Sequence, residues 1–204
     1  MAGPVTSMVK ASVLPVFCPG SDAGDGFEGT GFWVRNGVVT ASHVVAACPP
    51  GTTIDVGDGL GGTVSTDDRS HDLALVTYQS LGYRAPNTSP DPKPLRLESR
   101  PAYVGEPLAL LGIPALPVFG NPFKREVIVA TGHVVATNRT QVVTSANGAP
   151  ETLRDAIEVA VPGVVSGESG GPAIDSAGKV VGVIEGSAFG LTTLTPVTDL
   201  ASLR

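Results

Sequence analysis

The sequence predicts an all-β protein, and three observations indicate this fold class. Glycine and proline are abundant, with 26 and 18 residues among 204, and both favour turns over helix interiors. Valine, threonine and isoleucine recur in short runs, which is typical of strands. The dipeptide Asn36-Gly37 separates two such runs, and it is a strong signal for a tight β-hairpin. We therefore expect many short strands joined by turns.

The first part of the chain contains the strands of one unit. Residues 1–8 show no clear pattern, and the apolar residues 9–17 indicate the first strand. The hairpin at Asn36-Gly37 joins strands at residues 29–34 and 38–40, and a short helical turn is expected at residues 44–48. Further short strands are expected at residues 53–56, 62–65 and 73–77.

A proline-rich stretch divides the chain. Residues 86–94 include four prolines, and proline suits neither a helix interior nor a strand ladder. We expect a first domain at residues 9–85, a connector at 86–100 and a second domain at 101–204. Strands in the second domain are expected at residues 107–111, 126–136, 141–144, 156–161, 172–174, 179–185 and 191–195, with a short helix capped by Thr198 at residues 198–203.

Charge and hydropathy exclude several classes of partner. The net charge is −6, and the 13 lysines and arginines are scattered rather than gathered in the basic patch that nucleic acid requires. No apolar run approaches the roughly 20 residues of a membrane-spanning helix. His71 and His133 lie in no pattern typical of metal ligands. We therefore expect no nucleic acid, membrane segment or metal.

The glycine-flanked Ser169 is the candidate nucleophile. Glycines let the chain turn tightly and bring backbone N–H groups close to a reacting carbonyl. A serine also needs a histidine base and a carboxylate that orients it. His43 follows an apolar run, and Asp72 precedes another. Asp67 and Asp68 are nearby rivals, but the apolar run that follows Asp72 favours it, because the orienting carboxylate must be buried.

At these motifs the chain resembles a known family. The stretches G-T-G-F from Gly29, T-A-S-H-V-V around His43, H-D-L-A-L-V around Asp72 and G-E-S-G-G-P around Ser169 occur in the order of the trypsin-like serine proteases. The chain is most similar to the bacterial envelope branch, which includes Deg-type and mycobacterial acid-resistance proteases. The resemblance spans residues 9–196.

That resemblance implies both the architecture and the activity. It implies two six-stranded antiparallel β-barrels with the active site between them, and a serine endopeptidase acting on protein or peptide substrates through an acyl-enzyme. The N–H groups of Gly167 and Ser169 would form the oxyanion hole, and no cofactor is required. The sequence leaves the physiological substrate and the oligomeric state open.

Two alternatives were weighed against this interpretation. The serine motif also fits the nucleophile elbow of α/β-hydrolases, but that fold places its histidine after the serine. None of the three histidines follows Ser169, so this triad is excluded. The other alternative is a catalytically silent trypsin-like module that binds peptides or a partner, and the sequence leaves it open.

The two cysteines are Cys18 and Cys48. Their spacing does not distinguish a disulfide from two buried thiols, but the family resemblance implies a bridge around the strand that leads to His43. A disulfide indicates an oxidising compartment, so we expect a secreted, periplasmic or cell-envelope protein. The first four residues do not begin a secretory signal, and we expect the sequence to be a trimmed form of an exported protein.

Substrate specificity is inferred from the resemblance alone. It places Gly163 at the base of the pocket for the side chain that precedes the cleaved bond. It places the strand at residues 183–187 along that pocket and along the substrate backbone. We expect Glu185 to face solvent, because an unpaired buried charge is costly, and we expect cleavage after Val, Leu, Ala or Met. The expected pocket residues are Gly163, Val164, Val165, Ile184, Glu185, Gly186 and Ser187.

Overall fold

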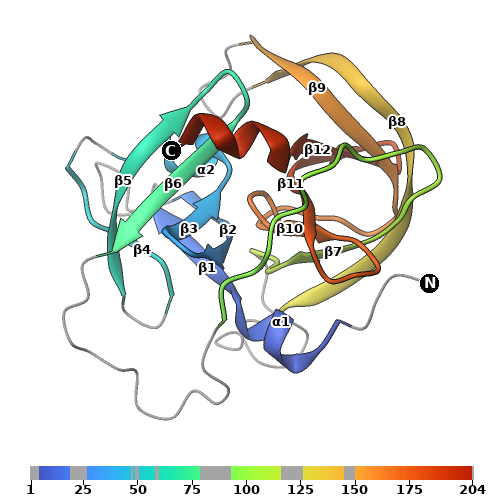
Figure 1. The fold of residues 1–204 in the computed structure, drawn as a ribbon. Coiled ribbons are helices and arrows are strands. Elements are labelled where there is room, and N and C mark those ends of the chain that lie inside the picture. The colour runs from blue at the N-terminus through green and yellow to red at the C-terminus, as the bar shows by residue number, and fades with distance from the viewer. Residues whose placement is uncertain are drawn as a thin grey trace.

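Two β-barrels stand side by side in the computed structural model (Figure 1). The structure describes residues 5–18, 27–46, 48, 51–57, 60–78, 93–115, 126–144 and 150–203. Each barrel is closed by six antiparallel strands, ordered β1-β2-β3-β6-β5-β4 and β10-β11-β12-β9-β8-β7. The predicted all-β double barrel is therefore confirmed. Among the described residues, no helix is long and apolar enough to cross a membrane.

The first barrel begins with a helix that the sequence did not predict. Val9 was expected in the first strand, but it lies in helix α1, where the Thr6 hydroxyl accepts a hydrogen bond from the Val9 N–H at 3.3 Å. A threonine in this position caps the free N–H groups of a helix start. The elements of this barrel are α1 (Ser7–Ala11), β1 (Val13–Cys18), β2 (Phe27–Val34), β3 (Gly37–Thr40), α2 (Ser42–Val45), β4 (Ile54–Asp55), β5 (Gly61–Asp68) and β6 (Leu73–Tyr78).

The apolar strand β3 connects the core of the first barrel to the junction between the barrels. Successive side chains of a strand point to opposite faces. Val38 packs inside the first barrel with Val16 and Ile54. Val39 packs on the other side, in a cluster that includes Leu111 of the second barrel. Because both faces of β3 are buried, the strand ends at Thr40 in a rigid setting just before His43.

The second barrel contains a strand longer than the sequence predicted. Residues 126–136 and 141–144 were expected as two strands, but they belong to one strand, β8, which continues through register shifts against β9. Asn138 has φ 55° at this irregularity, and asparagine tolerates that left-handed backbone better than most residues. The elements are β7 (Pro107–Gly112), β8 (Ile128–Thr144), β9 (Pro150–Ala160), β10 (Pro172–Ile174), β11 (Val180–Ala188), β12 (Leu191–Pro196) and η1 (Val197–Leu203).

Two segments tie the barrels together. The C-terminal helix η1, red in Figure 1, begins one residue before the expected cap Thr198 and contacts strands of both barrels. The chain that leads into the second barrel donates the Leu95 N–H to Trp33 at 2.8 Å and accepts from Val180 through Arg96 at 2.9 Å. Residues 86–92 of the expected connector lie outside the described residues, and the expected domain limits there stay predictions.

A disulfide joins Cys18 to Cys48, as the family resemblance implied. Cys18 is the last residue of β1, and Cys48 follows α2, so the bridge spans the region that carries His43. Reduction is expected to lower the free energy of unfolding by about 3–4 kcal/mol, because the bridge closes a loop of roughly 30 residues in the unfolded chain. Urea unfolding with and without reductant measures this loss.

The matched control for the disulfide is the double variant Cys18→Ala, Cys48→Ala. Its unfolding midpoint in urea should be lower than that of the oxidised wild-type protein and should not respond to reductant. Two free thiols, counted in denatured protein prepared under oxidising conditions, would contradict the bridge.

Candidate active site

Asp72 holds His43 through two hydrogen bonds, one to the ring and one to the backbone N–H. Helix α2 begins just after β3 and presents His43, and Asp72 lies immediately before β6. The His43 Nδ1 lies 2.8 Å from Asp72 Oδ2, and the His43 backbone N–H donates to Asp72 Oδ1 at 2.8 Å. Asp72 is 3% exposed, so little water competes for its carboxylate. Because Asp72 occupies Nδ1, Nε2 is the ring nitrogen available to a nucleophile.

The other aspartates of this region, Asp67 and Asp68, and the neighbouring His71 have separate partners. Asp67 accepts hydrogen bonds from Ser42 Oγ and from Arg69 Nε. Asp68 lies 2.8 Å from His71 Nδ1. His133 is exposed on β8. The structure therefore pairs Asp72, and neither of its two rivals, with His43.

The loop that carries Ser169 packs directly against the strands that lead to His43. The Thr30 N–H of β2 donates to the Ser169 carbonyl at 2.8 Å. At Gly170 the backbone approaches so closely that a Cβ atom would lie 2.1 Å from the Thr30 carbonyl oxygen and 2.9 Å from the Ala41 nitrogen. Only glycine permits this contact. The structure thus brings the serine loop and the His43 segment together at the junction of the barrels.

The Ser169 hydroxyl is directed at strand β11. It donates a hydrogen bond of 2.7 Å to the backbone carbonyl of Glu185. For attack on a carbonyl carbon, this hydroxyl must instead give its proton to a base, so its bond to the Glu185 carbonyl has to break. Catalytic hydrogen bonds often form only when substrate is bound, so the resting geometry is compatible with a nucleophile.

Two backbone N–H groups of the loop have a defined orientation. The Ser166 carbonyl accepts from the Ala115 N–H at 2.9 Å, and the Glu168 carbonyl accepts from the Gly171 N–H at 3.0 Å. In a trans peptide the C=O and N–H groups point in opposite directions. The N–H groups of Gly167 and Ser169 therefore point away from Ala115 and Gly171.

Glu168 is a buried carboxyl beside the nucleophile. It is 1% exposed, and its Oε1 has no hydrogen-bond partner in the described part of the chain. Its side chain packs against Gly112 of β7. Burial raises the pKa of Glu168 to about 7, although a hydrogen bond from the backbone of Val165 acts in the opposite direction. The folded protein thus holds this carboxyl protonated under mildly acidic conditions.

The protonation of Glu168 predicts a pH-dependent stability. The unfolded chain loses this proton near its ordinary pKa of 4.5, and the folded chain loses it near 7. The contribution of Glu168 is therefore fully present below about pH 4.5 and is lost as the pH rises through 7, by about 3 kcal/mol. Glu168→Gln should remove this slope, and urea unfolding of both proteins between pH 4 and 8 measures the difference.

The exposed Asp55 offers the control for that experiment. The free energy of unfolding of Asp55→Asn should differ from that of wild type by a nearly constant amount above pH 5. The buried, protonated carboxyl would be contradicted if the free energy of unfolding of Glu168→Gln depended on pH between 4.5 and 7 in the same way as that of wild type.

The expected specificity residues divide into open and buried positions. Gly163 is exposed, and a Cβ atom built on it or on Gly186 would meet nothing within 4 Å. Ile184 is fully buried in the core of the second barrel, so its side chain does not border an open pocket. Val164 packs partly against the same core, whereas Val165 and Ser187 are exposed.

The expectation that Glu185 faces solvent is wrong. Glu185 is 8% exposed, although strand alternation would place it opposite the buried Ile184. The pairing of β11 with β12 shifts in register between Ile184 and Gly186. Both faces of β11 are buried from Val180 to Glu185, so alternation along the strand does not bring Glu185 to solvent.

The sequence did not identify the side chain that connects the two barrels at this site. Thr30 donates its hydroxyl hydrogen to the Gly167 carbonyl at 2.7 Å and accepts from the Ile113 N–H at 2.9 Å. Thr30 was part of a noted motif, but no local signal reveals a bond to a residue 137 positions away.

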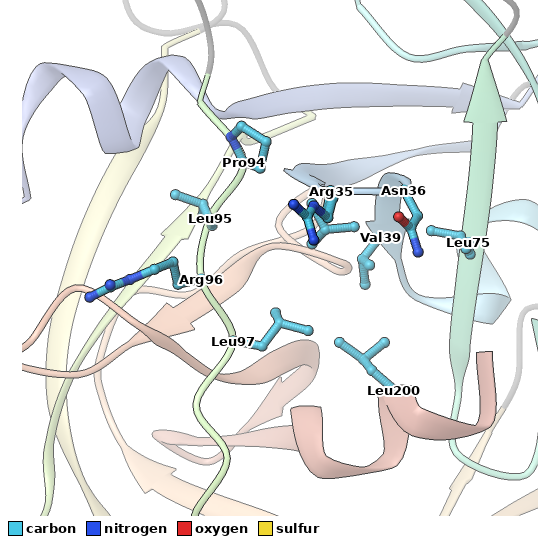
Figure 2. A pocket seen from close by; sticks show the side chains of 10 residues that line it. Arg35, Asn36, Val39, Leu75, Pro94, Leu95, Arg96, Leu97 and Leu200 are labelled. Carbon is cyan, nitrogen blue, oxygen red and sulfur yellow. The ribbon is translucent and has the colours of Figure 1, made fainter. Parts of the chain in front are cut away.

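The groove drawn in Figure 2 is separate from these residues. It has a volume of about 810 Å³ and is bordered by the β2–β3 hairpin, residues 94–97 of the expected connector and η1. Neither His43, Asp72 nor Ser169 lines it. The candidate site is therefore not part of this groove.

Comparisons with known proteins agree with the geometry. Residues 29–183 match the family model of the trypsin-like peptidase domain. The serine protease Rv3671c of Mycobacterium tuberculosis strain H37Rv is 30% identical over 190 residues, which cover 91% of this chain and 43% of the relative. An uncharacterized protein y4bJ of Sinorhizobium fredii is 31% identical, with 84% and 24% covered. The chain thus spans less than half the length of these curated relatives.

Solved structures of the mycobacterial protease have the same fold. The active form superposes with a TM-score of 0.76 at 27% identity, covering 98% of this chain and 82% of that one. The inactive form gives a TM-score of 0.70 at the same identity, covering 98% and 90%. These matches confirm the resemblance that the motifs predicted.

Proposed function

Because the chain belongs to the trypsin-like peptidase domain family, we propose that it is a serine endopeptidase that uses His43, Asp72 and Ser169. The observation that supports this proposal most directly is the pair of 2.8 Å contacts from one carboxylate to the ring and the backbone of His43. Such a pair sets the imidazole tautomer that a general base needs.

In the proposed reaction, His43 Nε2 takes the proton of Ser169 as the hydroxyl oxygen bonds to the substrate carbonyl carbon. The carbonyl electron pair moves onto its oxygen, which the N–H groups of Gly167 and Ser169 stabilise. Each such donor is worth roughly 2.7–4 kcal/mol of the barrier. The protonated His43 then donates to the leaving amine, and water hydrolyses the acyl-enzyme by the same steps. Asp72 stabilises the charged imidazole throughout.

The proposal also assigns a role to the resting hydrogen bond of Ser169. A peptide that pairs with residues 185–187 would offer a backbone N–H to the Glu185 carbonyl. That N–H would compete with the Ser169 hydroxyl, whose present bond to this carbonyl is 2.7 Å. Substrate binding would therefore release the hydroxyl to His43.

A fluorophosphonate probe tests the proposed activity. The probe should modify Ser169 in the wild-type protein, as seen by intact mass and by peptide mapping, and should not modify Ser169→Ala. An unlabelled wild-type protein would favour the silent peptide-binding module.

For specificity, we predict cleavage after Val, Leu, Ala or Met. The expected pocket base, Gly163, brings no carboxylate that could pair with Arg or Lys, and burying an apolar side chain contributes about 25 cal/mol per Å². A peptide library analysed by mass spectrometry measures the preference. A profile dominated by Arg and Lys would contradict this and would implicate Glu185, with Glu185→Gln as the deciding variant.

The disulfide also supports a proposed location. Disulfides persist in oxidising compartments and are rare in the cytosol. We therefore propose that the domain acts outside the cytoplasm, as a secreted or cell-envelope protein.

A further inference from the structure

Thr30 joins three segments of the chain through one buried hydroxyl. It lies in β2 of the first barrel and is 0% exposed. Its Oγ1 donates to the Gly167 carbonyl at 2.7 Å and accepts from the Ile113 N–H at 2.9 Å. Gly167 belongs to the serine loop, and Ile113 follows β7 in the second barrel. Both bonds are buried, so water does not readily replace them.

These bonds restrain Gly167, the glycine of the proposed oxyanion hole. Gly167 has φ 96°, a conformation that glycine leaves easily because it populates both signs of φ. Its preceding peptide is held through the Ser166 carbonyl by Ala115 at 2.9 Å. Its following peptide is held through the Gly167 carbonyl by Thr30. With both peptides held, the N–H of Gly167 keeps one direction.

The backbone of Thr30 restrains the same loop at a second point. The Thr30 N–H donates to the Ser169 carbonyl at 2.8 Å. The first barrel thus holds the carbonyls of Gly167 and Ser169, the two residues whose N–H groups would face the oxyanion. Thr40 in turn donates its hydroxyl to the Thr30 carbonyl at 2.7 Å, which connects Thr30 to strand β3 of the same barrel.

We propose that Thr30 is a positioning residue that holds the oxyanion hole through its hydroxyl; this inference rests on the proposed peptidase function. Without the hydroxyl, the Gly167 carbonyl and the Ile113 N–H both lose their buried partner, which is costly. The peptide that follows Gly167 would then rotate towards another partner. Gly167 would be restrained only through its preceding peptide, and its N–H would point at the oxyanion for less of the time. The covalent step slows, whereas the surfaces that bind the substrate are unchanged.

The test compares Thr30→Val, Thr30→Ser and Ser12→Ala by the rate of fluorophosphonate labelling of Ser169. The saturation curve separates the covalent rate constant from the binding constant of the probe. Thr30→Val has nearly the shape of threonine, and its covalent rate should fall roughly 10- to 100-fold, less than the full loss of one oxyanion donor. Its probe binding should change less than about threefold, and Thr30→Ser should restore the covalent rate.

Ser12→Ala is the control, because it removes a buried hydroxyl that donates to the Lys93 carbonyl at 2.7 Å, away from the serine loop. It should lower the unfolding midpoint about as much as Thr30→Val while labelling at nearly the wild-type rate. Thr30→Val labelling at the wild-type rate, or Ser12→Ala losing as much as Thr30→Val, would overturn the positioning role. An unlabelled wild-type protein would instead refute the proposed function itself.

Discussion

Replacing Ser169 by alanine is expected to lower kcat for peptide hydrolysis by about a million-fold, the loss seen when a triad serine is removed. The change deletes the oxygen that forms the acyl-enzyme in the proposed reaction. It should leave the fold intact, because the half-buried hydroxyl makes one hydrogen bond, to the Glu185 carbonyl, and the neighbouring glycines set the loop. Hydrolysis of a peptide chosen from the library and thermal unfolding measure the two effects.

His43→Ala is the companion variant to Ser169→Ala. The base and the nucleophile act in one step, so their losses are not additive, and the double variant should be no slower than either single variant. A Ser169→Ala protein that keeps more than about a hundredth of wild-type activity would exclude the proposed nucleophile.

Asp72→Asn is expected to lower kcat by about ten thousand-fold while leaving the geometry nearly unchanged, as in a triad with the same substitution. Asp72 accepts from both the backbone N–H and the Nδ1 of His43. Asparagine has one acceptor oxygen and one donor NH₂ group, so one of these bonds is lost or the ring adopts the wrong tautomer. Initial rates at several pH values, with circular dichroism for the fold, measure the effect.

Asp68→Asn is the matched control, since it makes the same chemical change in the same turn. Asp68 pairs with His71 at 2.8 Å, outside the proposed triad, so kcat should stay within about threefold of wild type, as for a surface substitution away from the site. If Asp68→Asn lost as much activity as Asp72→Asn, the orienting role of Asp72 would not stand.

The predictable parts of the fold were those set by neighbouring residues. Asn36-Gly37 specified the β2–β3 hairpin, because few other dipeptides adopt its turn. The strands β3, β6 and β10 were located closely because apolar, β-branched runs are flanked by turn residues. The prediction was wrong where a tertiary contact, and not the local pattern of apolar residues, determines the secondary structure. Val9 is apolar as a strand residue would be, yet it packs on the inter-barrel cluster from a capped helical turn.

The site shows the same division between local and distant information. The identity and order of His43, Asp72 and Ser169 were available from the motifs, because each chemistry needs a specific residue type. The motifs could not predict the rotamer of Ser169, which depends on the carbonyl of Glu185. They also could not predict the burial of Glu185, because both faces of β11 are buried there by packing that the local sequence does not reveal.

By itself the sequence determined the all-β class, the hairpin and the residue types that can carry acyl transfer, because these follow from backbone preferences and side-chain chemistry within a few positions. Only the tertiary structure decided which carboxylate holds His43, where the Ser169 hydroxyl points and how Thr30 restrains Gly167. These contacts join residues 29, 16 and 137 positions apart. Closing such loops costs entropy that only the complete packing of two barrels offsets, so no short stretch of the chain contains this information.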